Sequence, residues 1–253
     1  MIIPDDIPGE TPGKAVGEGR MRAMLLNLFR GGNFFEELQS LLISLPVIIL
    51  SLSFHEYGHA QMAYWCGDPT AKHKGRCTLN PLRHLDPVGF LMMLLVGLGY
   101  AKPVPVNPYN LRHGVRDDFL VSVAGVLCNL LLAVLSGAAI VIYYLGRVSG
   151  NPIAFAGWVS VAVDIAASLF SINIVLMVFN LLPVPPLDGY HVFNDLLFKG
   201  RLIPPQRATQ VGFGLLMLLS VTGLLSKMMG FFVTGAFDLL YQLAFTIARA
   251  WGV

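Results

Sequence analysis

Long apolar runs are the feature that most constrains how this chain can fold. A helix needs about 20 mostly apolar residues to cross a bilayer core of roughly 30 Å, because backbone polar groups must be paired within the segment there. The sequence therefore predicts an all-α polytopic membrane protein with four or five crossings. The expected crossings are residues 34–66, 119–145 and 153–182, followed by a short helical hairpin of residues 211–225 and 228–247.

The composition agrees with a chain that is embedded in a lipid bilayer. Only 13% of the 253 residues are charged and 55% are hydrophobic, whereas about 25% of an average soluble domain is charged. The formal net charge of +2 is too balanced to suggest a nucleic-acid partner. Three cysteines do not make a disulfide framework. We therefore expect the lipid bilayer as a partner and no nucleic acid.

The polar segment between the first two runs, residues 67–117, is the richest basic stretch of the chain. Basic loops stay on the cytoplasmic side of a membrane, so we expect this segment in the cytoplasm. Consecutive crossings then place Arg147 and Lys227 outside. Residues 88–100 are apolar but too short to span, and they hold three glycines. They predict a small re-entrant or membrane-associated element, with β structure expected between Gly75 and Pro108.

The chain divides into a short N-terminal segment and one large domain. Residues 1–33 carry basic side chains that would fall on the outer side, unless residues 21–33 form an interfacial helix or a re-entrant turn. No internal repeat or long linker divides the remainder of the chain. Residues 34–253 are therefore predicted to form a single polytopic membrane domain.

An HExxH pattern, His55, Glu56 and His59, lies toward the end of the first run. Residues four apart share one helical face, so the two histidines can offer imidazole nitrogens to one tetrahedral zinc ion. Glu56 lies about 100° further round the helix. From there it can act as general base on a water that the metal activates. The pattern is typical of metalloproteases.

The membrane setting favours a metal site over a chance match. Ionisable side chains are costly in hydrocarbon, and they are usually paired, metal-bound or in contact with a water-filled cavity. The simpler alternative is that HEYGH forms only the hydrated last turn of a helix that ends at the interface. A catalytic zinc ion needs three protein ligands, so a third ligand has to come from elsewhere in the chain.

A carboxylate at the inner end of the third run is the candidate for that ligand. Residues 180–189, NLLPVPPLDG, contain three prolines that stop the helix. A broken backbone at membrane depth is tolerated only inside protein or beside a cavity. Asp188 is held at this break, and Gly189 allows a close backbone approach. Taken alone, the segment is explained more simply as a helix stop with Asp188 as the N-cap of the next helix.

Together, these two segments resemble the paired signatures of the site-2 proteases, a family of intramembrane zinc metalloproteases (peptidase M50-like). The resemblance extends to residues 67–89, 101–112 and 124–129, and it covers about residues 50–195. It implies a site-2-protease-like transmembrane helix bundle with one zinc ion per chain and no appended soluble domain.

The resemblance also assigns roles to individual residues. It makes His55, His59 and Asp188 the zinc ligands and Glu56 the catalytic base. Asn129, in the element AGVLCN, would help to hold the substrate or the developing oxyanion. The proline that the family usually has in this element is a valine here. A small-residue packing seam with a buried amide is the alternative explanation of that element.

The implied reaction is hydrolysis of a peptide bond in or near a transmembrane segment, with a zinc-activated water and Glu56 as general base. The substrate would be a membrane protein or transmembrane peptide that unwinds locally. The HExxH end of its span meets the basic segment, so the active site is expected on the cytoplasmic side. The expected location is the cytoplasmic membrane of a prokaryote.

A metal or proton transporter is the alternative function, with Asp164 and the histidine and glutamate cluster as pathway groups. Against it, the ionisable residues converge on one helix end and one broken loop. No inverted repeat is evident in the sequence either.

Overall fold

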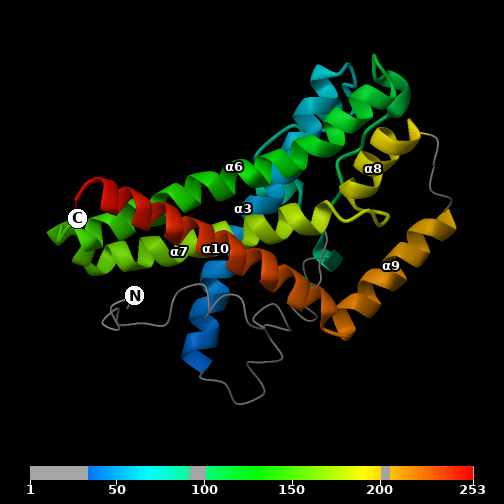
Figure 1. Ribbon diagram of the computed structural model, residues 1–253. Helices are drawn as coiled ribbons and strands as arrows, with labels where there is room; N and C mark the ends of the chain where they lie inside the picture. The colour runs from blue at the N-terminus through cyan, green and yellow to red at the C-terminus, as the bar shows by residue number, and fades with distance from the viewer. Residues whose placement is uncertain (1–33, 90, 92–100, 201–205, 253) are drawn as a thin grey trace.

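The computed structural model describes residues 34–89, 91, 101–200 and 206–252, and this part of the chain contains helices but no strand (Figure 1). Its elements are α3 (Phe34–Trp65), α4 (Thr70–His73), η1 (Pro81–Arg83), η2 (Pro108–Asn110), α6 (Val115–Val148), η3 (Pro152–Phe155), α7 (Gly157–Asn180), α8 (Asp188–Phe198), α9 (Gln206–Val221) and α10 (Leu224–Ala250). The prediction of an all-α membrane protein is confirmed. Among the described residues, α6, α7 and α10 are long and apolar enough to cross a membrane.

Two predicted elements fall outside the described part of the chain. The N-terminal segment, residues 1–33, is one of them, and most of the re-entrant element expected at residues 88–100 is the other. The first predicted crossing corresponds to α3, but the side chains at the start of that helix are not described.

Close contact between α3 and α6 brings the first motif against the second long helix. Gly58 of α3 makes this possible, because a Cβ atom added there would lie 2.8 Å from the carbonyl oxygen of Ala124 and 2.7 Å from the Sγ atom of Cys128. Small residues allow membrane helices to approach in this way. The close small-residue contact that the alternative explanation of the AGVLCN element expects is therefore present.

Helix α10 packs along α6 and α7 and runs in the same direction as α6. The rings of Phe237 and Phe170 lie 4.9 Å apart, and the rings of Tyr241 and Tyr144 lie 6.0 Å apart. Figure 1 shows the C-terminal end of α10 beside the C-terminal end of α6. The start of α10, with Lys227, consequently lies toward the N-terminal end of α6. The sequence analysis predicts the opposite side, beside Arg147 at the C-terminal end of α6, and this prediction is wrong.

The predicted hairpin boundary is also wrong. The break between α9 and α10 lies at Thr222 and Gly223, not at Ser226 and Lys227, because Gly223 adopts φ 75° and ends the helical path. Helix α9 has 16 residues, fewer than the about 20 that a crossing needs. The expected fourth crossing is therefore a short helix.

The basic segment is fastened at both ends by one carboxylate. Asp68 is fully buried and accepts hydrogen bonds from Thr70 N at 3.0 Å, Asn107 N at 2.7 Å and Asn110 Nδ2 at 2.9 Å. Because these donors come from the start and the end of the segment, Asp68 closes it into a loop against the end of α3.

The β structure expected between Gly75 and Pro108 is absent from the described residues of that range. The reason lies in the proline spacing. Pro103, Pro105 and Pro108 lack the N–H groups that a strand needs at regular intervals. Turns capped by asparagine form instead, as at Asn107, whose side chain accepts a hydrogen bond from Tyr109 N at 3.2 Å.

Candidate metal centre

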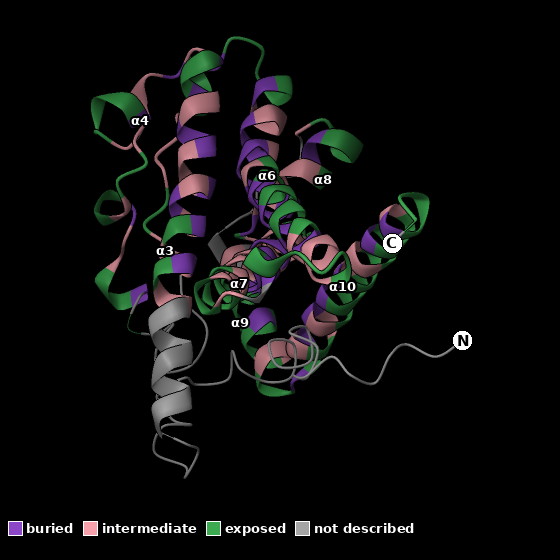
Figure 2. Ribbon diagram, turned by 90° about the vertical axis from the view of Figure 1, so that its left-hand side faces the viewer, coloured by how far each residue is buried: buried purple, intermediate pink, exposed green. Residues whose placement is uncertain are grey.

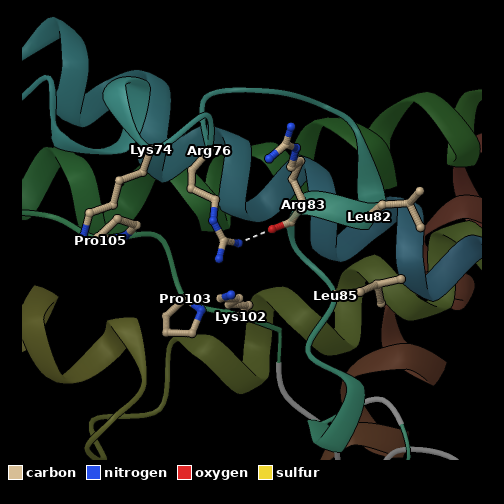
Figure 3. Close-up of a pocket in the computed structure, with 8 residues that line it drawn as sticks. All are labelled: Lys74, Arg76, Leu82, Arg83, Leu85, Lys102, Pro103 and Pro105. Carbon is tan, nitrogen blue, oxygen red and sulfur yellow. Dashed lines mark hydrogen bonds between the residues drawn. The ribbon is translucent and has the colours of Figure 1, made fainter.

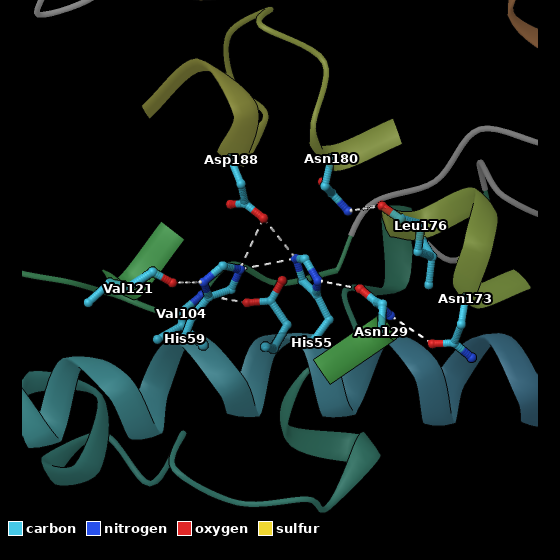
Figure 4. A network of polar contacts seen from close by, with 10 residues as sticks. His55, His59, Val104, Val121, Asn129, Asn173, Leu176, Asn180 and Asp188 are labelled. Atoms are coloured by element: carbon cyan, nitrogen blue, oxygen red, sulfur yellow. Dashed lines mark hydrogen bonds and ion pairs between the residues drawn. The ribbon is translucent and has the colours of Figure 1, made fainter. Parts of the chain in front are cut away.

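Two histidines and one aspartate meet between α3, α6 and α8 (Figure 4). His55 and His59 are buried on one face of α3, and their Nε2 atoms lie 3.0 Å apart. The Oδ2 atom of Asp188 lies 3.2 Å from each of these nitrogens. The structure thus brings together the three ligands that the sequence predicts.

The outer nitrogen of His59 is held by a backbone carbonyl. Its Nδ1 atom lies 2.7 Å from the carbonyl oxygen of Val121 in α6, and both groups are buried. A carbonyl oxygen can only accept, so Nδ1 must carry the proton. In the neutral ring, the Nε2 atom that faces Asp188 is therefore unprotonated and carries a lone pair.

The outer nitrogen of His55 is fixed by a longer chain of hydrogen bonds. Asn173 Nδ2 donates to the Leu169 carbonyl oxygen at 2.8 Å, which sets the orientation of that amide. Asn129 Nδ2 then donates to Asn173 Oδ1 at 2.8 Å, which leaves Asn129 Oδ1 to accept from His55 Nδ1 at 2.7 Å. The Nε2 atom of His55 is unprotonated and carries a lone pair for the same reason as in His59.

Three electron-pair donors therefore face one another in a buried space. Oδ2 of Asp188 has no hydrogen-bond partner in the described part of the chain, and an unpaired buried carboxylate oxygen is costly. A tetrahedral zinc ion with ligand bonds of about 2.0–2.1 Å separates its ligand atoms by about 3.3 Å. The observed separations of 3.0–3.2 Å fit that geometry.

Asp188 reaches the histidines because of how α7 ends and α8 begins. Helix α7 stops at Asn180, and Asp188 is the first residue of α8, with Leu187 at the N-cap and no side-chain cap. The N-cap explanation of Asp188 is therefore wrong. Gly189 permits the tight path, since a Cβ atom there would lie 2.3 Å from the carbonyl oxygen of Leu181.

Glu56 lies beside the three ligands and faces the basic segment. Its Oε2 atom accepts a hydrogen bond from Val104 N at 3.0 Å. Within the described residues, Oε1 has no hydrogen-bond partner, and the side chain is only partly buried. One carboxylate oxygen of Glu56 is thus fixed by the backbone of the basic segment.

The side-chain amide of Asn129 does not face open space. The residue is fully buried, and both ends of its amide are occupied by His55 and Asn173. Asn173 also donates to Ser51 Oγ at 2.9 Å. In this structure Asn129 therefore contacts a candidate metal ligand.

Several residues that position the site were missed by the sequence analysis. Asn173 and Val104 contribute through contacts that span 44 and 48 residues, so no local pattern reveals them. Asp164, proposed as a transport group, is exposed near the start of α7. It is outside the cluster.

Comparison with known proteins gives a consistent family. Residues 43–221 match the model of Peptidase family M50. The chain belongs to peptidase family M50. The predicted resemblance to the site-2 proteases is confirmed, and nothing in the comparisons supports a transporter.

Individual relatives of this M50 peptidase are bacterial. It is 39% identical over 178 residues to YwhC of Bacillus subtilis, which bears the name of a zinc metalloprotease, and the match covers 70% of this chain and 79% of YwhC. It is 31% identical over 186 residues to Rip2 of Mycolicibacterium smegmatis, which is named in the same way, with 71% of this chain and 66% of Rip2 covered. No solved structure matches this chain.

A glycine in α6 leaves room for the two histidine rings of the M50 peptidase. A Cβ atom on Gly125 would lie 2.3 Å from Nε2 of His59 and 2.7 Å from Cε1 of His55. Both distances are far below van der Waals contact, so the rings would have to move. Gly125 is therefore part of the geometry that makes the two nitrogens converge.

We predict that Gly125→Ala lowers the zinc content of the purified M50 peptidase by at least about tenfold, because the new methyl group displaces both rings. Metal analysis by mass spectrometry measures this. Gly235→Ala is the matched control, since a Cβ atom at that helical glycine meets nothing within 4 Å. Full zinc occupancy in a folded Gly125→Ala variant would contradict the role of this contact.

A second polar cluster joins α8 to the start of α6. Nδ1 of His191 lies 3.3 Å from Oδ2 of Asp118, and the buried Asp195 lies next to both. Burial, together with the negative charge of Asp118, raises the pKa of Asp195 to about 6. The cluster connects the helix that begins with Asp188 to the helix that holds His59 through Val121.

We predict that Asp195→Asn stabilises the peptidase at pH 8 by roughly 1 kcal/mol, or a few degrees in melting temperature. The raised pKa means that the folded state binds this proton more tightly than the unfolded state does. Stability therefore falls as the pH rises from about 4 through 6, and the ionised carboxyl is unfavourable above that range.

The measurement is thermal unfolding in detergent from pH 4.5 to pH 8. The stabilisation should shrink toward pH 4.5, where the wild-type carboxyl is mostly protonated. Asp86→Asn serves as the control, because Asp86 accepts hydrogen bonds from Val88 N and Gly89 N that an asparagine can also accept. An increase in melting temperature that is equal at all pH values would refute the electrostatic explanation.

Proposed function

We propose that this M50 peptidase is an intramembrane zinc metalloprotease in which His55, His59 and Asp188 hold the zinc ion and Glu56 is the general base. The observation that carries the proposal is the convergence of three lone pairs at 3.0–3.2 Å, two of them fixed by hydrogen bonds at the outer ring nitrogens. Such an arrangement is stabilised when a cation binds there.

A zinc ion held by His55, His59 and Asp188 would supply Lewis-acid chemistry, by lowering the pKa of a water molecule and polarising a carbonyl group. Glu56 removes a proton from the attacking water through Oε1 and delivers it to the leaving amine. The hydrogen bond from Val104 N to Oε2 keeps the carboxylate oriented during both transfers. No acyl-enzyme forms on the chain, because water is the nucleophile.

Asn129 acts in this proposal as a positioning residue for His55. Its Oδ1 atom holds the His55 Nδ1 proton, so Nε2 stays available as a ligand. The oxyanion role implied by the family resemblance would require Nδ2 to leave Asn173, where it forms a buried hydrogen bond of 2.8 Å. The two roles predict different effects of a substitution.

The substrate in this proposal is a segment of a membrane protein or a transmembrane peptide. A helical segment hides its carbonyl groups in internal hydrogen bonds, so it must unwind before attack. The extended, proline-rich residues 101–107 pass directly beside Glu56 and provide a surface for an unwound peptide.

The active site faces the cytoplasmic side of a prokaryotic membrane in this proposal. Val121, which holds His59, lies within the first two turns of α6, and the basic segment precedes that helix. Lys227 lies toward the same end. The positive-inside tendency thus applies to both loops, and the relatives YwhC and Rip2 are bacterial proteins.

We predict that Glu56→Gln abolishes peptide cleavage by at least about 10³-fold and leaves zinc bound, because the amide cannot accept the proton. The assay uses fluorogenic transmembrane peptides with the full chain in detergent, and zinc is measured on the same samples. Glu37→Gln, outside the HExxH pattern, is the control. Cleavage by Glu56→Gln at the wild-type rate would refute the proposed base.

We predict that Asn129→Ala weakens zinc affinity by about 10–100-fold, because His55 loses the partner that fixes its ring. An oxyanion role would instead leave zinc affinity unchanged and lower only the turnover rate, by about 10²–10³-fold. Titration with a competing chelator separates these results. Asn180→Ala is the matched control, since the Asn180 amide donates to Leu176 O within α7 and does not contact a histidine.

A further inference from the structure

A basic pocket, drawn in Figure 3, is lined by residues of the polar segment that follows α3. It has a volume of about 550 Å³ and is formed by the loop between α3 and α6. Four of its lining residues are cations, and no carboxylate is among the described residues that line it. The four cations are Lys74, Arg76, Arg83 and Lys102.

The backbone around the pocket is held in place by hydrogen bonds. The Arg76 guanidinium donates to the carbonyl oxygen of Arg83, and Lys102 N donates to His84 O at 2.8 Å. None of the four cations forms an ion pair with a residue in the described part of the chain. Within the described residues, their positive charges have no carboxylate partner, which favours an anionic ligand.

The same pocket has an apolar side. Leu82 and Leu85 line it together with the cations, and 76% of the Leu82 surface is exposed. Leu79 and Val88, in the same loop, are 43% and 60% exposed. A soluble anion gains nothing from these leucines, whereas a lipid presents its phosphate and its acyl chains side by side.

The position of the pocket relative to the membrane interface also fits a lipid head group. Its loop is fastened along the last part of α3 by Cys77 Sγ, which donates to Gln61 Oε1 at 3.1 Å, and by Val104 N on Glu56. This is the end of α3 that leads into the polar segment, where a membrane helix reaches the interface. Basic pockets at that level bind anionic head groups.

We propose that this pocket binds the phosphate group of an anionic phospholipid. Lys74, Arg76, Arg83 and Lys102 line the pocket and supply the positive charge that attracts the phosphate, and Leu82 and Leu85 contact the start of the acyl chains. Pro103 and Pro105 line the same pocket on either side of Val104, whose N–H group holds Glu56. Lipid binding therefore orders the segment that orients the catalytic base, a consequence that rests on the proposed function.

The test is lipid retention by the full chain, purified in detergent and examined by native mass spectrometry with phosphatidylglycerol or phosphatidylcholine. The double variant Lys74→Gln/Lys102→Gln should bind phosphatidylglycerol about tenfold more weakly and phosphatidylcholine as the wild type does. Lys227→Gln/Arg249→Gln removes the same charge from two exposed positions outside the pocket. It should leave phosphatidylglycerol binding within twofold of wild type.

Equal retention by the pocket variant and the wild type would overturn the proposal, and so would equal loss in both double variants. Zinc content of each variant shows whether the site is intact. Peptide cleavage in vesicles with and without phosphatidylglycerol is measured separately, so a failure of lipid binding is distinguishable from a failure of the protease assignment.

A second arm distinguishes a lipid from a soluble anion. Inorganic phosphate at millimolar concentration should not displace phosphatidylglycerol from the wild type. Leu82→Ser/Leu85→Ser should weaken lipid retention several-fold with all four cations present. Displacement by phosphate, or full retention by the leucine variant, would show that the pocket takes a soluble anion and would overturn the lipid assignment.

Discussion

The convergence of two imidazole lone pairs and one carboxylate oxygen is the constraint on which the rest of the structure depends. Such groups repel one another unless a cation lies between them. The chain maintains the arrangement by holding the outer nitrogens of His55 and His59 from α6, through Asn129 and the Val121 carbonyl. Each of these two histidines is therefore oriented by a different helix from the one that carries it, and α3 and α6 have to pack closely.

That close packing explains why polar groups are tolerated at this depth. Asn173 is fully buried, yet its amide donates both to a carbonyl oxygen one turn earlier in α7 and to Ser51 in α3. Each bond removes a polar group from contact with apolar surroundings, which is the requirement inside a membrane protein. Figure 2 shows buried residues on the sides of α3 and α6 that face each other. The network thus stabilises the helix bundle and orients the candidate metal ligand His55.

Sequence analysis predicted the parts of the site that depend on local geometry. The spacing of His55 and His59 corresponds to one helical turn. The prolines before Asp188 cannot continue a helix, so they mark where the preceding helix ends. Asn173 was not predictable, because its function depends on a partner 44 residues away. The sequence predicts the break between α9 and α10 at Ser226 and Lys227, but both residues lie inside α10. Gly223, a residue type common at helix ends, carried the better signal.

Two proline-rich segments flank the site, and their composition has a physical reason. Irregular backbone near the membrane leaves N–H groups that need acceptors, and a proline has none to satisfy. Among the remaining donors, Val104 N binds Glu56, while Val184 N donates to Leu182 O at 2.8 Å and Leu187 N donates to Val184 O at 2.9 Å. Proline thus lets the chain be non-helical on both sides of the candidate metal ligands at low cost.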